Sequence, residues 1–191
     1  TWNVRAMSAA LLSCGLATLV VRHAGIGDLV QYTMPQPPLY GSYQEFAIVL
    51  GAVIAIGVVL FDKTQSLLPK FDRKSPKMIV IALLSFAVIG VMAMYFPEIL
   101  GNGKAGNQLT FTDLVGWDYA LGLLATKWIA VLLALMAGAY GGRITPSMML
   151  GSTLALAFAA LWSIMVSPVH IGFAAFIGAV IFLGLAQKMP L

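Results

Sequence analysis

Long apolar runs separated by short polar stretches make up most of this chain. Apolar residues dominate six runs, at 5–21, 43–61, 78–96, 118–140, 146–166 and 171–187. A helix that crosses a bilayer needs about 20 predominantly apolar residues, and these runs reach or approach that length. The pattern therefore predicts an all-α integral membrane protein that crosses the membrane several times.

The polar stretches between the runs predict loops and an orientation. Residues 62–77 hold the densest positive cluster of the chain, with five Lys and Arg against two Asp. Because cytoplasmic loops carry an excess of Lys and Arg, we expect 62–77 to be cytoplasmic. Residues 28–42 contain three prolines, which favour a loop or an extended segment. On the opposite side, Pro97 and the glycines of 101–106 favour a flexible outer loop.

Composition narrows the classes of function. Hydrophobic residues make up 60% of the 191 residues and charged residues only 9%, whereas soluble domains carry roughly 25% charged residues. The net charge of +4 comes from scattered Lys and Arg without a nucleic-acid-binding motif, so no nucleic-acid partner is expected. The single cysteine, Cys14, is interpreted as a small packing residue. No metal or cofactor is predicted.

The stretch 138–147 predicts a break between two helices at membrane depth. Two adjacent glycines, Gly141 and Gly142, free the backbone from the usual φ limits. Thr145 is a good helix N-cap, and Pro146 is favoured at the first helical position. The start of a helix presents unpaired N–H groups and the positive end of its dipole, which suit an anion. Our hypothesis is that this loop holds a small anion that crosses the membrane.

Two polar side chains near the predicted break are candidate pathway residues. Lys127 lies about nine residues into the run 118–140, roughly 14 Å along a helix. It could snorkel to the interface, pair with a carboxylate elsewhere in the polypeptide, or face an anion path. Ser147 follows Pro146 directly and would lie in the first turn of the next helix.

The last two runs carry hydroxyl and small residues that favour helix packing. Hydrogen bonds within or between helices are expected to account for most of the hydroxyls of the run 146–166, which include Ser152, Thr153 and Ser163. Ala174 and Gly178 are four residues apart, and small residues at this spacing let two helices approach closely. These residues are therefore interpreted as structural rather than functional.

Four segments of the chain match, in order, the motifs of one known family. Residues 97–103 read Pro-Glu-Ile-Leu-Gly-Asn-Gly, Lys127 follows, 141–151 read Gly-Gly-Arg-Ile-Thr-Pro-Ser-Met-Met-Leu-Gly, and 187–191 read Gln-Lys-Met-Pro-Leu. They resemble the CLC family of chloride channels and chloride/proton antiporters, whose second-half anion loop has the pattern Gly-Gly-x-Phe-x-Pro. The resemblance covers essentially the whole chain and is firmest over 78–191.

The resemblance implies an architecture of two inverted halves, built from tilted and broken helices and assembled as a homodimer in the lipid bilayer. Residues 1–40 would end the first repeat and 41–191 would form most of the second, within a single transmembrane domain. We expect a piece of a longer polypeptide, because the family's gating glutamate and pore tyrosine have no counterpart in this chain. Chloride would be the transported ligand, and the short loops favour a bacterial inner membrane.

The resemblance also assigns roles at the predicted loop. The backbone N–H groups of Arg143 and Ile144 would bind the anion, Gly141 and Gly142 would allow the turn, and Pro146 would start the helix. Two positions depart from the family pattern, which has an apolar residue at 143 and an aromatic one at 144. Ile144 keeps the amide without the ring. Arg143 places a full charge beside the path, where it raises local anion concentration, slows release, or snorkels to water.

Transport of chloride or a similar small anion is therefore the leading hypothesis. One alternative is a scaffold or accessory subunit with the same helices. Another is an intramembrane enzyme, which would need paired acids or a Ser–His pair. The two histidines, His23 and His170, lie near the ends of apolar runs, so the protein is expected not to be an enzyme. Channel versus antiporter and the identity of the anion stay open, because the proton-coupling carboxylates would lie outside this chain.

Overall fold

The computed structural model describes residues 4–24, 32, 43–69, 71, 75–112, 115–139 and 144–187. The chain divides into two compact units, 1–33 and 34–191, and each is described by itself. The predicted repeats, 1–40 and 41–191, stay a prediction. The first unit contains helix α1 (Val4–His23), which accounts for the apolar run 5–21. Its C-terminal end is closed by a bond from Ala24 N–H to Val20 O of 2.9 Å.

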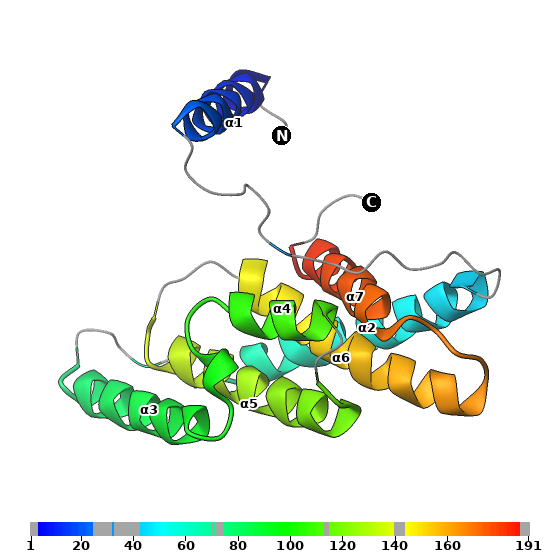
Figure 1. Cartoon of the computed structure of the whole chain (residues 1–191). Coiled ribbons are helices and arrows are strands. Elements are labelled where there is room, and N and C mark those ends of the chain that lie inside the picture. The colour runs from blue at the N-terminus through cyan, green and yellow to red at the C-terminus, as the bar shows by residue number, and fades with distance from the viewer. Residues whose placement is uncertain are drawn as a thin grey trace. The chain divides into compact units, whose positions relative to one another are not determined.

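The second unit is a bundle of helices joined by short connections (Figure 1). In chain order it contains α2 (Tyr43–Ser66), α3 (Lys77–Ala93), the 3-10 turn η1 (Pro97–Ile99), α4 (Lys104–Phe111), α5 (Trp117–Met136), α6 (Ile144–Met165) and α7 (Ile171–Ala186). Helices α2, α5 and α6 are each long enough and apolar enough to cross a membrane, whereas α3 and α7 are shorter apolar helices. Among the described residues there is no strand, and the predicted all-α membrane fold is confirmed.

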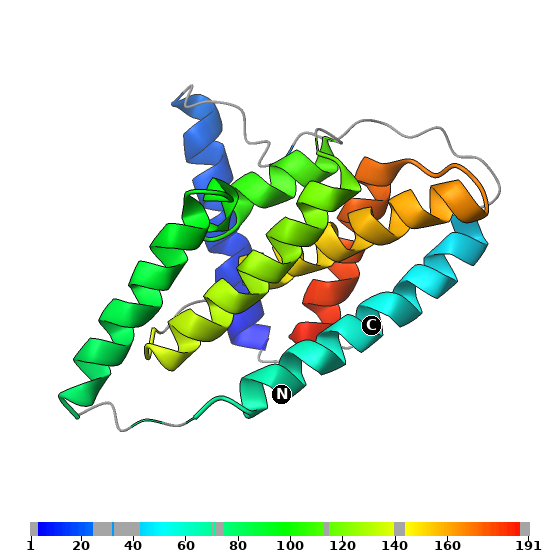
Figure 2. The same ribbon diagram turned by 90° about the horizontal axis from the view of Figure 1, so that it is seen from below.

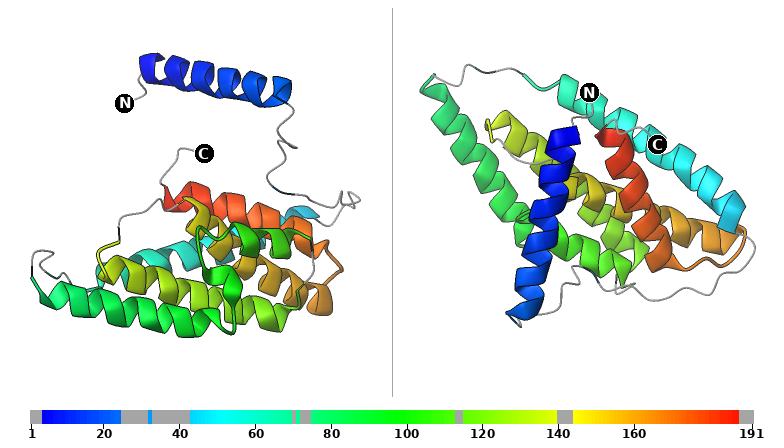
Figure 3. Two further views of the ribbon diagram at one scale, coloured as in Figure 1. Left: turned by 60° about the vertical axis from the view of Figure 1, so that its left-hand side comes forward. Right: turned by 90° about the horizontal axis from the view of Figure 1, so that it is seen from above.

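Helix α6 is the centre of the second unit. It contacts α2, α4, α5 and α7, and nine of its residues are buried. Figure 2 shows α5 and α6 between α2 at one edge and α3 at the other. The right-hand view of Figure 3, from the opposite side, shows the same order. The position of the first turn of α6 is therefore set by several neighbouring helices.

The contact between α6 and α7 depends on glycine. A Cβ on Gly151 would overlap the carbonyl of Gly178, and a Cβ on Gly178 would overlap the Cβ of Ala155. Ala174 and Gly178 both lie on the buried side of α7. The close helix approach predicted at this small pair is confirmed, because the two backbones touch where a larger residue would separate them.

Helix α2 turns its buried face toward α6 and α7. Phe46, Leu50, Ile54 and Phe61 are buried, and their intervals of four and seven residues place them on one helical face. The ring of Phe46 meets that of Trp162 edge-on, with 5.7 Å between the centroids. This face orients α2 so that its last turns form one wall of a cavity beside α5.

Helix α2 continues further than predicted. The apolar run was expected to end at Phe61 and the loop 62–77 to follow, but the helix reaches Ser66. The Thr64 hydroxyl donates to Phe61 O at 2.8 Å and accepts from Trp128 Nε1 of α5 at 3.1 Å. Hydropathy placed the end too early because this turn is stabilised by polar contacts rather than by apolar side chains.

The prediction of a flexible loop at 97–106 is wrong, since this segment contains η1 and the start of α4. Gly103, at φ +90°, precedes α4, and the Asn102 side chain accepts from Lys104 N–H at 3.0 Å. Gly106 is buried in α4, where a Cβ would overlap Met149 of α6. The sequence pattern missed α4 because the helix is short and mixed in polarity, and its buried side is defined by contacts to α6 and α7.

Helix α5 ends at Met136, before the predicted end at residue 140. Ala139 N–H donates to Ala134 O and Gly138 N–H donates to Leu135 O, each at 3.0 Å. Gly138 has φ +76°. Two such bonds around a glycine in the left-handed region are the Schellman ending of a helix. Gly138 therefore ends α5. The sequence pattern predicts only that this glycine lies within the break at 138–147.

Candidate functional site

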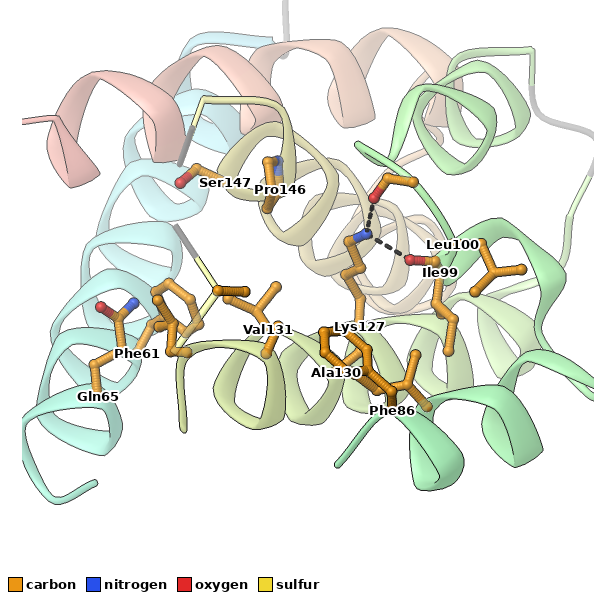
Figure 4. Close-up of a pocket in the computed structure, with 15 residues that line it drawn as sticks. Phe61, Gln65, Phe86, Ile99, Leu100, Lys127, Ala130, Val131, Pro146 and Ser147 are labelled. Carbon is orange, nitrogen blue, oxygen red and sulfur yellow. Dashed lines mark hydrogen bonds between the residues drawn. The ribbon is translucent and has the colours of Figure 1, made fainter. Parts of the chain in front are cut away.

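A cavity of about 300 Å³ lies along α5, between α2, α3, the segment after η1 and the start of α6. Its polar side chains are Gln65, Lys127 and Ser147, and its other walls are mainly apolar (Figure 4). The apolar residues labelled in Figure 4 are Phe61, Phe86, Ile99, Leu100, Ala130, Val131 and Pro146. A concave apolar site with a few polar groups is the usual form of a small-ligand site.

One face of α5 forms the length of the cavity. Lys127, Val131 and Leu135 all line it, and their spacing of four residues keeps them on one side of the helix. Eight residues of helix correspond to about 12 Å, so the cavity is elongated along α5. Figure 4 shows Lys127 directed toward the segment after η1, with Ser147 and Gln65 on the α2 side.

Lys127 is buried and binds backbone carbonyls. Its side chain is 3% exposed, and Nζ donates to Ile99 O at 2.7 Å and to Gly101 O at 3.2 Å. The snorkelling alternative is wrong for this structure, because the ammonium turns into the unit instead of toward water. The carbonyl acceptors were not foreseen from the sequence, since they lie 26 and 28 residues earlier in the chain.

The segment that accepts from Lys127 needs glycine at two points. Gly101 and Gly103 have φ of +65° and +90°, and residues other than glycine rarely adopt this left-handed backbone region. At Gly103 a Cβ would lie 3.0 Å from Met149 Sδ and 3.6 Å from Lys127 Cε. The segment can therefore pass close to both α5 and α6 and present carbonyl oxygens to the ammonium.

A second side chain of α5 binds the same segment. The Tyr119 hydroxyl donates to Glu98 Oε2 at 2.7 Å, and its ring lies 5.1 Å from that of Phe96. Tyr119 precedes Lys127 by eight residues, which is about 12 Å along the helix. Residues 98–101 are thus held to α5 at two separate points. Sequence reasoning missed this contact, although the helical spacing of Tyr119 and Lys127 was visible.

The first turn of α6 reaches the cavity. Ile144 and Thr145 belong to this turn, and Pro146 and Ser147 line the cavity. The helix begins at Ile144, so the predictions that Thr145 is the N-cap and Pro146 the first helical residue are wrong. Pro146 is tolerated because the first four N–H groups of a helix have no intrahelical acceptor.

The remaining residues of the predicted anion loop lie outside the described part of the chain. These are Gly141, Gly142 and Arg143, so their assigned roles stay predictions. Ile144 is 53% exposed and does not line the cavity. Of the predicted site residues, the structure therefore brings together Lys127, Pro146 and Ser147 around one cavity.

The other hydroxyl groups of α6 have structural roles. Ser152 Oγ and Asn107 Oδ1 are 3.0 Å apart, across the contact between α6 and α4. Thr153 donates to Met149 O at 2.7 Å, and Ser163 Oγ accepts from Val169 N–H at 3.2 Å. The expectation of bonds within or between helices is confirmed for Ser152 and Thr153, whereas Ser163 binds the backbone of the connection between α6 and α7. Within the described ranges, no group of three or more His, Cys, Asp or Glu is arranged to hold a metal ion.

Span-length helices that surround a cavity lined by the buried Lys127 are typical of a multi-pass helical membrane protein. The chain belongs to the voltage-gated chloride channel family, because the family model described as "Voltage gated chloride channel" matches residues 1–191. The resemblance seen in the sequence motifs is confirmed.

Curated relatives of this chain are bacterial transporters. The chain is 26% identical over 183 residues to the H(+)/Cl(-) exchange transporter ClcA of Vibrio vulnificus strain YJ016, covering 89% of this chain and 38% of the relative. It is 27% identical over 172 residues to the protein of the same name from Vibrio parahaemolyticus, covering 83% and 35%. The chain thus spans little more than a third of these relatives. No solved structure matches it significantly.

Proposed function

We propose that this chain contributes to the transmembrane transport of chloride or a similar small anion. The observation that carries the proposal is the first turn of α6, whose residues Pro146 and Ser147 line the same cavity as the buried Lys127. The relatives from Vibrio, which are named H(+)/Cl(-) exchange transporters, support the same activity.

In this proposal the anion is held by backbone N–H groups at the start of α6. Arg143 and Ile144 supply donors, Gly141 and Gly142 permit the turn, and Thr145 belongs to the same turn. Pro146 has no N–H, so further donors come from Ser147 and the residue after it. Amide groups carry no full charge, and the anion therefore binds weakly enough to be released, which conduction requires.

The wider assembly is part of the proposal. We expect a homodimer in a bacterial inner membrane, with the basic stretch 62–77 in the cytoplasm because of the positive-inside rule. The helical part of that stretch reaches Ser66, so Asp62 and Lys63 would lie near the membrane surface rather than in an extended loop. Chloride is the ligand and no cofactor is required.

The proposal is tested with the complete polypeptide reconstituted into chloride-loaded vesicles. Chloride efflux and external pH are recorded together after an ionophore for the counter-ion is added. Efflux with proton uptake identifies an antiporter, and efflux without proton movement identifies a channel. Folded, inserted protein that releases no halide would overturn the proposal and favour a scaffold or accessory subunit.

A further inference from the structure

The ammonium of Lys127 is a buried charge without a charged partner in the described part of the chain. Its two hydrogen-bond acceptors, Ile99 O and Gly101 O, are neutral carbonyls, and the side chain is 3% exposed. An ammonium has three N–H donors, so one donor is left after these two bonds. Buried charges in proteins are normally paired with an opposite charge.

The carboxylate of the neighbouring segment is already engaged elsewhere. Glu98 accepts from Tyr119 OH at 2.7 Å. Tyr119 belongs to α5 and lies about 12 Å along this helix from Lys127, given eight residues at 1.5 Å each. Glu98 is thus held toward the other attachment point of the segment, and among the described residues no carboxylate pairs with Lys127.

The space beside Lys127 suits a small mobile ion. The residue lines the cavity of about 300 Å³, whereas a water molecule in the liquid occupies about 30 Å³. The cavity therefore has room for a halide ion together with several waters. Ser147, which is 2% exposed, lines the same cavity on the α2 side. Beside mainly apolar walls, the attraction between an anion and the ammonium is stronger than in bulk water.

We propose that the cavity holds a small inorganic anion, of the halide class, as the counter-ion of Lys127. The inference rests on the proposed transport function and adds a second anion site, separate from the backbone site at 141–147. Among the described residues, Lys127 is near Ile99, whereas Ser147, the last residue of the backbone site, lies on the α2 side of the cavity (Figure 4). An ion at one position would repel an ion at the other and promote its release, as in pores with several sites.

The decisive experiment is a crystal structure of the complete polypeptide with bromide in place of chloride. The anomalous signal of bromide locates the ion without reference to protein density. We expect one peak in contact with Lys127 Nζ and another at the backbone N–H groups of 141–147. Lys127→Met should remove the first peak and keep the second, and Lys127→Arg should keep both.

The outcomes separate this inference from the proposed function. A peak at 141–147 alone, with Lys127 well ordered, overturns the second site and leaves the transport proposal intact. The absence of both peaks counts against both. Continuous acyl-chain density that fills the cavity also overturns the second site. The wild-type map decides the question even if Lys127→Met does not fold.

A flux measurement gives an independent test. Lys127→Met should raise the half-saturating chloride concentration at least about tenfold, the effect expected for losing a charged hydrogen-bond partner. Lys104, at the start of α4, is exposed and is the matched control, because Lys104→Met changes the same charge outside the cavity. If both variants keep the wild-type concentration dependence, Lys127 has no anion ligand.

Discussion

Replacing Gly151 with alanine should loosen the contact that positions α6. The added Cβ would overlap the Gly178 carbonyl oxygen and lie 2.5 Å from Phe182 Cβ and 2.9 Å from Gly178 C. Backbone atoms cannot rotate away as a side chain can. The helices α6 and α7 must therefore separate by on the order of 1 Å to restore ordinary contact distances.

The expected loss follows from two opposing effects. Overpacking of this kind costs up to about 3 kcal/mol, while exchanging Gly for Ala inside a helix gains about 1 kcal/mol. Gly151→Ala should therefore destabilise the folded protein by about 2 kcal/mol. Gly90, in α3, is the matched control because nothing lies within 4 Å of a Cβ placed there. Gly90→Ala should leave stability unchanged or slightly increase it.

The assay is unfolding of the complete polypeptide in detergent, followed by tryptophan fluorescence. Trp162 is a suitable reporter because its ring meets Phe46 on α2, at 5.7 Å between centroids. Gly151→Ala should unfold earlier than wild type, and its anion flux should fall because the first turn of α6 shifts with the helix. If Gly151→Ala is as stable as Gly90→Ala, the close backbone contact between α6 and α7 at Gly151 and Gly178 does not fix the position of α6.

Three further variants test the rest of the site. Tyr119→Phe removes a hydrogen bond to a carboxylate, so stability should fall by about 1.5–3 kcal/mol in the same unfolding assay; an unchanged midpoint would mean that Glu98 is held without it. Gly142→Val should weaken calorimetric chloride binding while membrane insertion is kept, and unchanged affinity would exclude the loop as the site. Arg143→Gln should slow flux at low salt if its charge faces the path, whereas an equal rate would support snorkelling.

Hydropathy predicted the large helices well, because each apolar run is long enough to require burial in lipid or protein. The run 146–166, for example, corresponds to α6 at Ile144–Met165. The small pair at Ala174 and Gly178 was also interpreted correctly, since close approach needs small residues whatever the neighbouring helix. These features depend on local composition, which a sequence displays directly.

The failures share a different physical origin. Helix α4 was missed because its buried side packs mainly against α6 and α7, which are remote in sequence. The last turn of α2 was missed because Thr64 binds Trp128, 64 residues further along the chain. The carbonyl acceptors of Lys127 are likewise remote in sequence. A hydrophobicity pattern contains no information about such partners, so it identified Lys127 as notable without predicting its contacts.

The three hydrogen bonds that Tyr119 and Lys127 of α5 donate to residues 98–101 also determine where this part of the molecule is stiff. Because α5 is attached to the segment 98–101 at two points about 12 Å apart, the segment can neither slide along the helix nor rotate about a single contact. The second attachment point, Lys127, lies 11 residues before Gly138, where the chain leaves α5 through a turn with φ +76°. The cavity wall formed by Ile99 is therefore fixed to α5, and a movement of that helix would take this wall with it.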